Sequence, residues 1–145
     1  MKKNINLAKI LFLLFIFFTI ALSLYSYAQN NPEKPTPKLI TLDKAAPERV
    51  KILNGPPETV TMHSGYMVLA PSKSVGRHST KDNEEAIVVL SGIGEMNIIG
   101  ESTLHLRPYC VAYCPPNTEH NVTNTGTDTL RYVYIVAKIV AKAKK

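Results

Sequence analysis

Residues 76–92, GRHSTKDNEEAIVVLSG, contain the features that decide the fold of this chain. The apolar, β-branched run 86–90 predicts a strand, and Gly92 predicts the turn that ends it. Alternate residues of a strand share a face, so Glu85 lies on the same face as the second and fourth residues of the run. If that face points into a core, the carboxylate is costly to bury unless it is paired or binds a metal. The neighbouring Glu84 then faces water.

Two histidines lie in turns that lead into predicted strands. His78 follows Gly76 by two residues and precedes Glu85 by seven, whereas His120 follows the diproline at 115–116. A single histidine is most often a structural hydrogen-bonding group, but two beside an inward glutamate favour a metal site. Imidazole and carboxylate groups suit divalent iron, manganese, nickel or zinc. The residues therefore predict a site for one of these ions.

The chain after residue 58 has the pattern of an all-β domain. Runs of about five residues rich in β-branched and aromatic types alternate with Gly, Pro, Asn and Asp turns, as in β-sandwiches and barrels. The predicted strands are residues 59–63, 66–70, 85–90, 94–99, 103–107, 110–114, 121–123 and 130–140. The last strand could turn helical over 136–145. We expect the barrel to span 58–140 and a basic tail to follow at 141–145.

Residues 1–28 have the features of a secretory signal. Lysines precede the apolar stretch 10–24, and small residues stand where a signal peptidase reads, which predicts cleavage after Ala28. An uncleaved single-span anchor is the alternative. Either way we expect the domain to be exported, periplasmic or secreted. A Pro-rich spacer and N-terminal arm at 29–57 connects the leader to the barrel.

The formal net charge is +6, and three of the lysines lie in the leader. Several other lysines crowd the last eight residues, which is typical of a solvated tail. Nucleic-acid binding would need a face of Arg and Lys with aromatic residues, so we expect no nucleic-acid partner. Membrane contact is expected only through an uncleaved leader.

Cys110 and Cys114 are the only cysteines. On one strand they would stand about 13 Å apart at about 3.3 Å per residue, whereas bridged cysteines have Cα atoms at roughly 4.4–6.8 Å. We therefore expect free thiols packed in the core. An intersubunit disulfide and a thiol beside the metal are the alternatives.

Runs 86–90 and 131–140 carry apolar residues on both faces. A surface strand of a monomer should show one polar face. The N-terminal segment or a second subunit must then cover the outer face, and we predict a homodimer.

The two motif regions resemble those of the cupin superfamily, small double-stranded β-helix (jelly-roll) barrels. His78, Glu85 and Gly92 fit the order and spacing of the first cupin motif. The residues that fit the second motif are Pro115, His120 and Asn124. The resemblance covers roughly residues 58–137 and implies an all-β, cupin-like jelly-roll barrel of the compact single-domain type.

This chain departs from the cupin pattern at several positions. Thr80 stands where the family has its second histidine, and a neutral hydroxyl is a poor ligand for a divalent ion. Three further residues replace family glycines: Ser72, Tyr109 and Asn117. The resemblance then implies a 2-His-1-carboxylate set with open positions, which suits Fe(II) and oxygen chemistry. The ligands of that set are His78, Glu85 and His120.

The resemblance implies binding of a small organic molecule and a dioxygenase-type oxidation. The alternatives are a non-catalytic module for a sugar or phenolic compound, a sugar isomerase or epimerase, and a barrel whose site residues only bond one another. Residues that could line the pocket or support the ligands are Thr80, Glu84, Tyr113 and Asn124. Of the remaining histidines, we expect His105 to face solvent and His63 to be structural or to line the pocket mouth.

Overall fold

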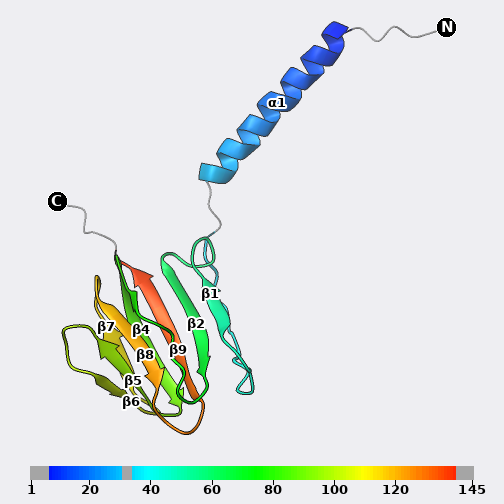
Figure 1. Ribbon diagram of the computed structural model, residues 1–145. Helices are drawn as coiled ribbons and strands as arrows, with labels where there is room; N and C mark the ends of the chain where they lie inside the picture. The colour runs from blue at the N-terminus through cyan, green and yellow to red at the C-terminus, as the bar shows by residue number, and fades with distance from the viewer. Residues whose placement is uncertain (1–6, 31–33, 140–145) are drawn as a thin grey trace. The chain divides into compact units, whose positions relative to one another are not determined.

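The structure, a computed structural model, describes residues 7–30 and 34–139, and the chain divides into two units. The first contains α1 (Leu7–Asn30), an exposed apolar helix (Figure 1). Its segment Ala8–Tyr27 has a mean hydropathy of 2.3 and is long enough to cross a membrane, a test that signal sequences also meet. This apolar helix is consistent with the predicted leader, and the predicted cleavage position at Ala28 lies within it.

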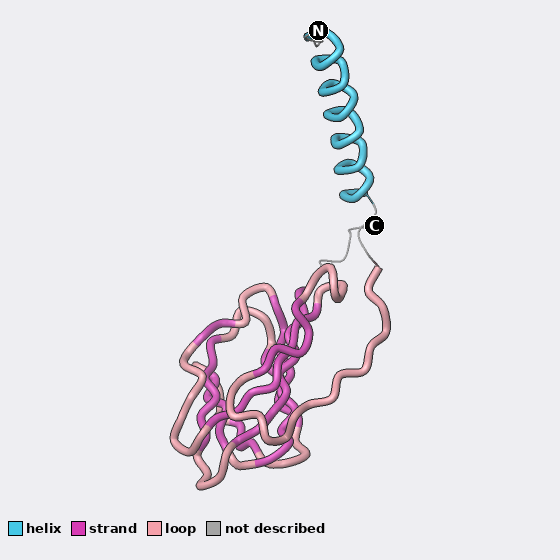
Figure 2. Tube along the Cα trace, turned by 90° about the vertical axis from the view of Figure 1, so that its right-hand side faces the viewer, coloured by secondary structure: helices cyan, strands magenta, loops and turns pink. Residues whose placement is uncertain are grey.

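The second unit, from Pro35 onward, is built from strands in two antiparallel sheets (Figures 1 and 2). The five-stranded sheet has the order β1-β2-β9-β4-β7, and the four-stranded sheet has the order β3-β8-β5-β6. From β3 onward the chain crosses repeatedly between the sheets, which is the topology of a jelly roll and confirms the predicted fold. The strands are β1 (Val50–Asn54), β2 (Met62–Leu69), β3 (His78–Ser79), β4 (Asn83–Ser91), β5 (Gly94–Ile98), β6 (Leu104–Leu106), β7 (Val111–Cys114), β8 (Glu119–Asn124) and β9 (Leu130–Lys138).

The core lies between the two sheets and follows the predicted alternation. On β4, Glu85 is 9% exposed and Ile87 and Val89 are fully buried, while Glu84 is exposed. The predicted inward direction of Glu85 is therefore confirmed. The largest apolar side chains of the core come from both sheets: Ile87, Met96, Leu106, Val122, Leu130 and Tyr132.

Turns of the barrel keep the backbone that glycine would favour even where the residue is different. Ser72, Tyr109 and Asn117 all have φ between 56° and 66°, in the left-handed region. These are the three positions where the cupin pattern has glycine. At Gly92, which also has positive φ, a Cβ would lie 2.6 Å from the Leu130 Cα, so only glycine fits there.

Two strand predictions are wrong at the start of the barrel. Residues 59–63 and 66–70 were expected as separate strands, but β2 runs unbroken through Gly65, and residues 59–61 lie in the preceding turn. Gly65 is accommodated because the Tyr134 ring packs against its backbone. In addition, β1 pairs with β2, so the arm adds a strand before residue 58. The expected helical turn over 136–145 is absent as far as residue 139, and the basic tail at 141–145 lies outside the described residues.

The outer face of the five-stranded sheet is covered only in part. Near β2, Arg131 donates hydrogen bonds to the Ala46 carbonyl (2.9 Å) and to the Tyr66 hydroxyl (3.2 Å), and both Ala46 and Tyr66 are buried. The N-terminal arm thus covers the part of the outer face near β2. The N-terminal segment was one of the two covers expected from the sequence, the other being a second subunit. On β7, at the other edge, Val111 and Tyr113 are 68% and 53% exposed.

Candidate metal centre

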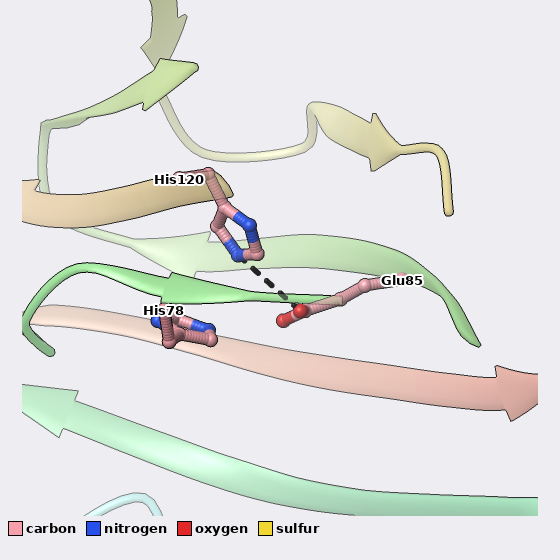
Figure 3. Close-up of side chains that lie close together, drawn as sticks. All are labelled: His78, Glu85 and His120. Atoms are coloured by element: carbon pink, nitrogen blue, oxygen red, sulfur yellow. Dashed lines mark ion pairs between the residues drawn. The ribbon is translucent and has the colours of Figure 1, made fainter. Parts of the chain in front are cut away.

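Three strands bring the predicted ligands together. His78 on β3 pairs directly opposite His120 on β8, and β4 of the facing sheet supplies Glu85 (Figure 3). Potential ligand atoms of the three side chains lie within 4.8 Å of one another. The imidazole ring centroids are 4.3 Å apart, and Nε2 of His120 is 3.3 Å from Oε2 of Glu85. The sequence separation of 42 residues between the histidines is thus closed by strand pairing.

Each histidine has its Nδ1 in contact with a neighbour, which leaves Nε2 available to a metal ion. Nδ1 of His78 is 2.9 Å from the Gly76 carbonyl oxygen and donates to it in the corresponding tautomer. Nδ1 of His120 lies 3.3 Å from the Cys114 Sγ and 3.5 Å from the Thr118 carbonyl. Such contacts orient imidazoles that bind metals through the other nitrogen.

The donor set fits a divalent ion. Nε2 of His120 is buried and has no hydrogen-bond partner among the described residues. Its polar neighbour is the Glu85 carboxylate, at 3.3 Å, which forms an ion pair with it only when the imidazole is protonated. A metal ion would hold the neutral imidazole and the carboxylate together. Ligand–metal distances of roughly 2.0–2.2 Å place two donors at most about 4.4 Å apart, so the three side chains need only a small approach. His78, Glu85 and His120 would hold the ion.

Thr80 has a different task from the histidine that it replaces. Its hydroxyl donates to the Pro115 carbonyl (2.8 Å) and accepts from the Thr118 N–H (3.0 Å), and its own N–H donates to the Thr118 carbonyl. It is 5% exposed. The side chain therefore ties the turn before β4 to the turn before β8 and so positions the two ligand-bearing strands.

A cavity of about 420 Å³ is lined by His78 and Glu85, whereas the third ligand, His120, is fully buried and is not among the lining residues. Its walls include Thr80 and His63 from the predicted set of neighbours. The Tyr113 hydroxyl donates to Glu84 at 3.1 Å on the exposed outer side of the sheet, so this pair lies outside the cavity. Asn124 lies at the other end of β8, also away from the cavity. His105 is 79% exposed, as expected.

Among the cavity residues that sequence reasoning did not identify are Arg49, Tyr132 and Tyr134. Inward alternation along β9, RYVYIV, could have indicated both tyrosines, since Tyr132 and Tyr134 are buried on one face with Leu130. Burial, and then the Glu85 carboxylate, raise the pKa of Tyr132, so the phenol stays neutral. Nothing in the arm's composition indicated Arg49.

The two cysteines do not form a disulfide with each other, and the expected core position holds for Cys114, whereas Cys110 is only partly buried. Cys114 is fully buried, and its Sγ lies 3.3 Å from Nδ1 of His120. This contact agrees with the alternative prediction of a thiol beside the metal site. Burial, and secondarily the Glu85 charge, raise the pKa of Cys114 to about 11. The protonated thiol is therefore the form that contacts His120 at neutral pH.

Comparison with known proteins places the barrel in a family. Residues 65–136 match the sequence model of a family described as "Cupin domain". A search among curated proteins gave no match.

Solved structures with the same fold include three that share 16–19% identity with this chain. A cupin 2 conserved barrel domain protein from Salinispora arenicola is 19% identical, with TM-score 0.59 over 71% of this chain and 90% of that chain. A cupin domain from Schizosaccharomyces pombe is 16% identical, with TM-score 0.57. The match covers 63% of this chain and only 64% of that chain. A predicted oxalate decarboxylase from Thermotoga maritima is 17% identical, with TM-score 0.52 over 69% of this chain and all of that chain. At these identities the likeness shows the fold alone. The motifs, the barrel and the family match together show that this chain belongs to the cupin superfamily, through a single cupin type-2 domain.

Proposed function

We propose that this chain is an exported cupin that binds a divalent metal through His78, Glu85 and His120 and uses it on a small organic molecule. The convergence of three ligand groups carries the proposal: the fully buried Nε2 of His120 has no hydrogen-bond partner among the described residues, the Glu85 carboxylate lies 3.3 Å from it, and His78 lies beside both. When bound, the metal supplies Lewis-acid or redox chemistry to an oxygen-bearing compound. Iron with O₂ would give the dioxygenase-type oxidation that this ligand set suits.

The protein residues contribute binding and orientation. Three protein ligands leave coordination positions for a small molecule, as in catalytic rather than structural metal sites. His78 is exposed at the cavity mouth, while Glu85 and His120 are buried, so a ligand reaches the site from one side. Apolar walls from Met67, Val122 and Val136 displace water around it.

Metal analysis of the purified full-length chain, kept in a mild detergent because of α1, tests the metal site. Near-stoichiometric metal is expected in the wild type and in His105→Ala, whose imidazole is solvent-exposed. His120→Ala should lose most of it. Equal metal in all three proteins, or none in the wild type, would contradict the site.

Turnover separates the enzyme from a non-catalytic binder. Metal-loaded protein should consume O₂ with phenolic or carboxylate compounds, and metal removal should stop the reaction. Small carboxylates belong in the first set because one structural neighbour is described as a predicted oxalate decarboxylase. Binding without turnover would favour the module for a small molecule, and isomerisation of a sugar would favour the isomerase alternative.

Export and dimerisation extend the proposal. An N-terminus at Gln29 in the protein recovered from its host would support a cleaved leader, whereas retention of α1 would indicate an anchor. For the homodimer, we propose the exposed half of the outer face at β7 as the contact, because Val111 and Tyr113 are apolar or aromatic and largely exposed. Light scattering should give twice the monomer mass, and Val111→Lys should halve it.

A further inference from the structure

Arg49 places a positive charge at the cavity that the barrel itself does not supply. It comes from the arm, directly before β1, and lines the cavity together with two of the proposed metal ligands, His78 and Glu85. Its guanidinium donates to the Tyr134 hydroxyl and lies 5.0 Å from the centre of the Tyr134 ring. Among the described side chains, no carboxylate lies within ion-pair distance of Arg49. The charge is therefore unneutralised.

The position of this guanidinium is built into the fold. Tyr134 is 8% exposed, and its ring lies so close to β2 that a Cβ at Gly65 would stand 2.5 Å from the phenol oxygen. Gly65 thus makes room for the ring, and the ring supports Arg49 from below by cation–π contact. Because β1 pairs with β2, the backbone next to Arg49 is held on the same sheet. Arg49 is itself exposed, and its guanidinium is held at the cavity by the buried Tyr134.

The formal charges of the cavity residues and of a bound metal ion add up to a positive total. Glu85 is the only acidic residue among the described residues that line it. A divalent ion held by Glu85 and two neutral histidines leaves a net charge of about +1 by addition of formal charges, to which Arg49 adds another. The second arginine, Arg77, is already neutralised by Glu119, at 3.0 Å from its Nε. A ligand with negative charge would complete the balance.

We propose that Arg49 makes this cavity selective for small carboxylates. The planar guanidinium retains N–H donors beyond the one used by Tyr134, and it matches a carboxylate in a two-bonded fork. A cavity of about 420 Å³ limits the ligand to a small molecule. The inference rests on the proposed metal site for the full charge count, whereas the contact with Arg49 stands without the metal.

Matched pairs of carboxylate and amide test the charge directly. Calorimetric titration of the metal-loaded full-length chain with propionate and benzoate, each against its neutral amide, should show at least about tenfold preference for the carboxylate. Arg49→Met keeps the length of the stem and should clearly reduce that preference in the metal-loaded protein and abolish it in the metal-free protein, while its metal content and unfolding temperature stay near wild type. Arg49→Lys should restore part of it, since the charge returns without the fork. Arg77→Met should leave it unchanged.

The outcomes separate this inference from the metal site. Equal binding of acid and amide by the wild type, no binding of either carboxylate, or an undiminished preference in Arg49→Met would overturn the role of Arg49. If the wild type holds no metal, the proposed function fails, but a weaker preference that depends on Arg49 should persist in the metal-free protein. Absence of that preference would overturn the inference as well.

Discussion

His120 and Asn124 lie four residues apart on β8, point to the same side of the strand and are 0% and 1% exposed. Asn124 donates to the Leu69 and Asp128 carbonyls, both at 2.8 Å, and accepts from the Gly126 N–H at 2.9 Å. His120 has no hydrogen-bond partner for Nε2 among the residues described. Both residues belong to the second motif. Asn124 forms hydrogen bonds with turns at the end of the barrel away from the site, whereas His120 is one of the proposed metal ligands.

The hydrogen bonds of a buried polar side chain indicate whether its role is structural or functional. Burial alone does not distinguish the two, because each is enclosed by the same sheets. The hydrogen-bonded amide of Asn124 adds stability and specifies a turn, whereas Nε2 of His120 faces only the Glu85 carboxylate, as a metal ligand would. Removing Asn124 should therefore weaken the fold, and removing a ligand should weaken metal binding.

The largest effect is expected at the glutamate pair on β4. Glu85→Gln keeps the shape of the inward side chain but removes its negative charge, so metal affinity should fall by about 100-fold or more, equivalent to about 3 kcal/mol. Glu84→Gln, on the outer side, is the matched control and should bind metal as the wild type does. Isothermal titration with zinc measures both. Similar losses in the two variants would remove the distinction between the faces.

Asn124→Ala should reduce the free energy of unfolding by about 3 kcal/mol, because the Leu69, Asp128 and Gly126 backbone groups lose their partner. Metal bound per folded molecule should not change. Urea unfolding and metal analysis of the same samples check the two statements. A loss of metal that exceeds the loss of folded protein would place Asn124 in the site after all.

Thr80→Val should cost about 1–2 kcal/mol of stability, since it leaves the partly buried Thr118 N–H without its acceptor at Thr80 and the Pro115 carbonyl without its donor. Ser79→Ala, next in the chain and partly exposed, is the control. Metal affinity should fall only slightly, because Thr80 positions the ligand strands without supplying a ligand. A loss as large as that of Glu85→Gln would instead make the Thr80 hydroxyl a ligand.

The smallest effect concerns Cys114 and appears only at alkaline pH. Its pKa rises from an ordinary 9.0 to about 11, because of burial first and the Glu85 charge second. The folded state then keeps a proton that the unfolded state loses, so stability should fall between pH 9 and 11, by about 2 kcal/mol. The difference between wild type and Cys114→Ser in metal-free urea titrations isolates this contribution. Parallel pH profiles for the two proteins would contradict it.

The sequence could predict the parts of the site that depend on local pattern. Strand parity assigned Glu85 rather than Glu84 to the core, and motif spacing selected His78 and His120. The positive φ values at Ser72, Tyr109 and Asn117 show why the fold survives without the family glycines, since the turn backbone is retained despite the strain.

The parts that depended on distant contacts could not be predicted. Arg49 meets Tyr134 across 85 residues, and the arm enters the sheet only because β1 pairs with β2. In the sequence, Gly65 indicates a break between two short strands. In the structure it lies within β2, where the absence of a side chain makes room for the Tyr134 ring. In both cases the information lies in a partner far along the chain.

The increase in unfolding temperature on addition of zinc compares His120 and Asn124, at the two ends of β8, most directly. With zinc at about 100 times its dissociation constant for the wild type, binding should stabilise the folded state by about 2.7 kcal/mol. Asn124→Ala should start from a lower unfolding temperature and show the same increment, whereas His120→Ala should show almost none. An equal increment in His120→Ala, or its loss in Asn124→Ala, would contradict the claim that Nε2 of His120 marks the metal site.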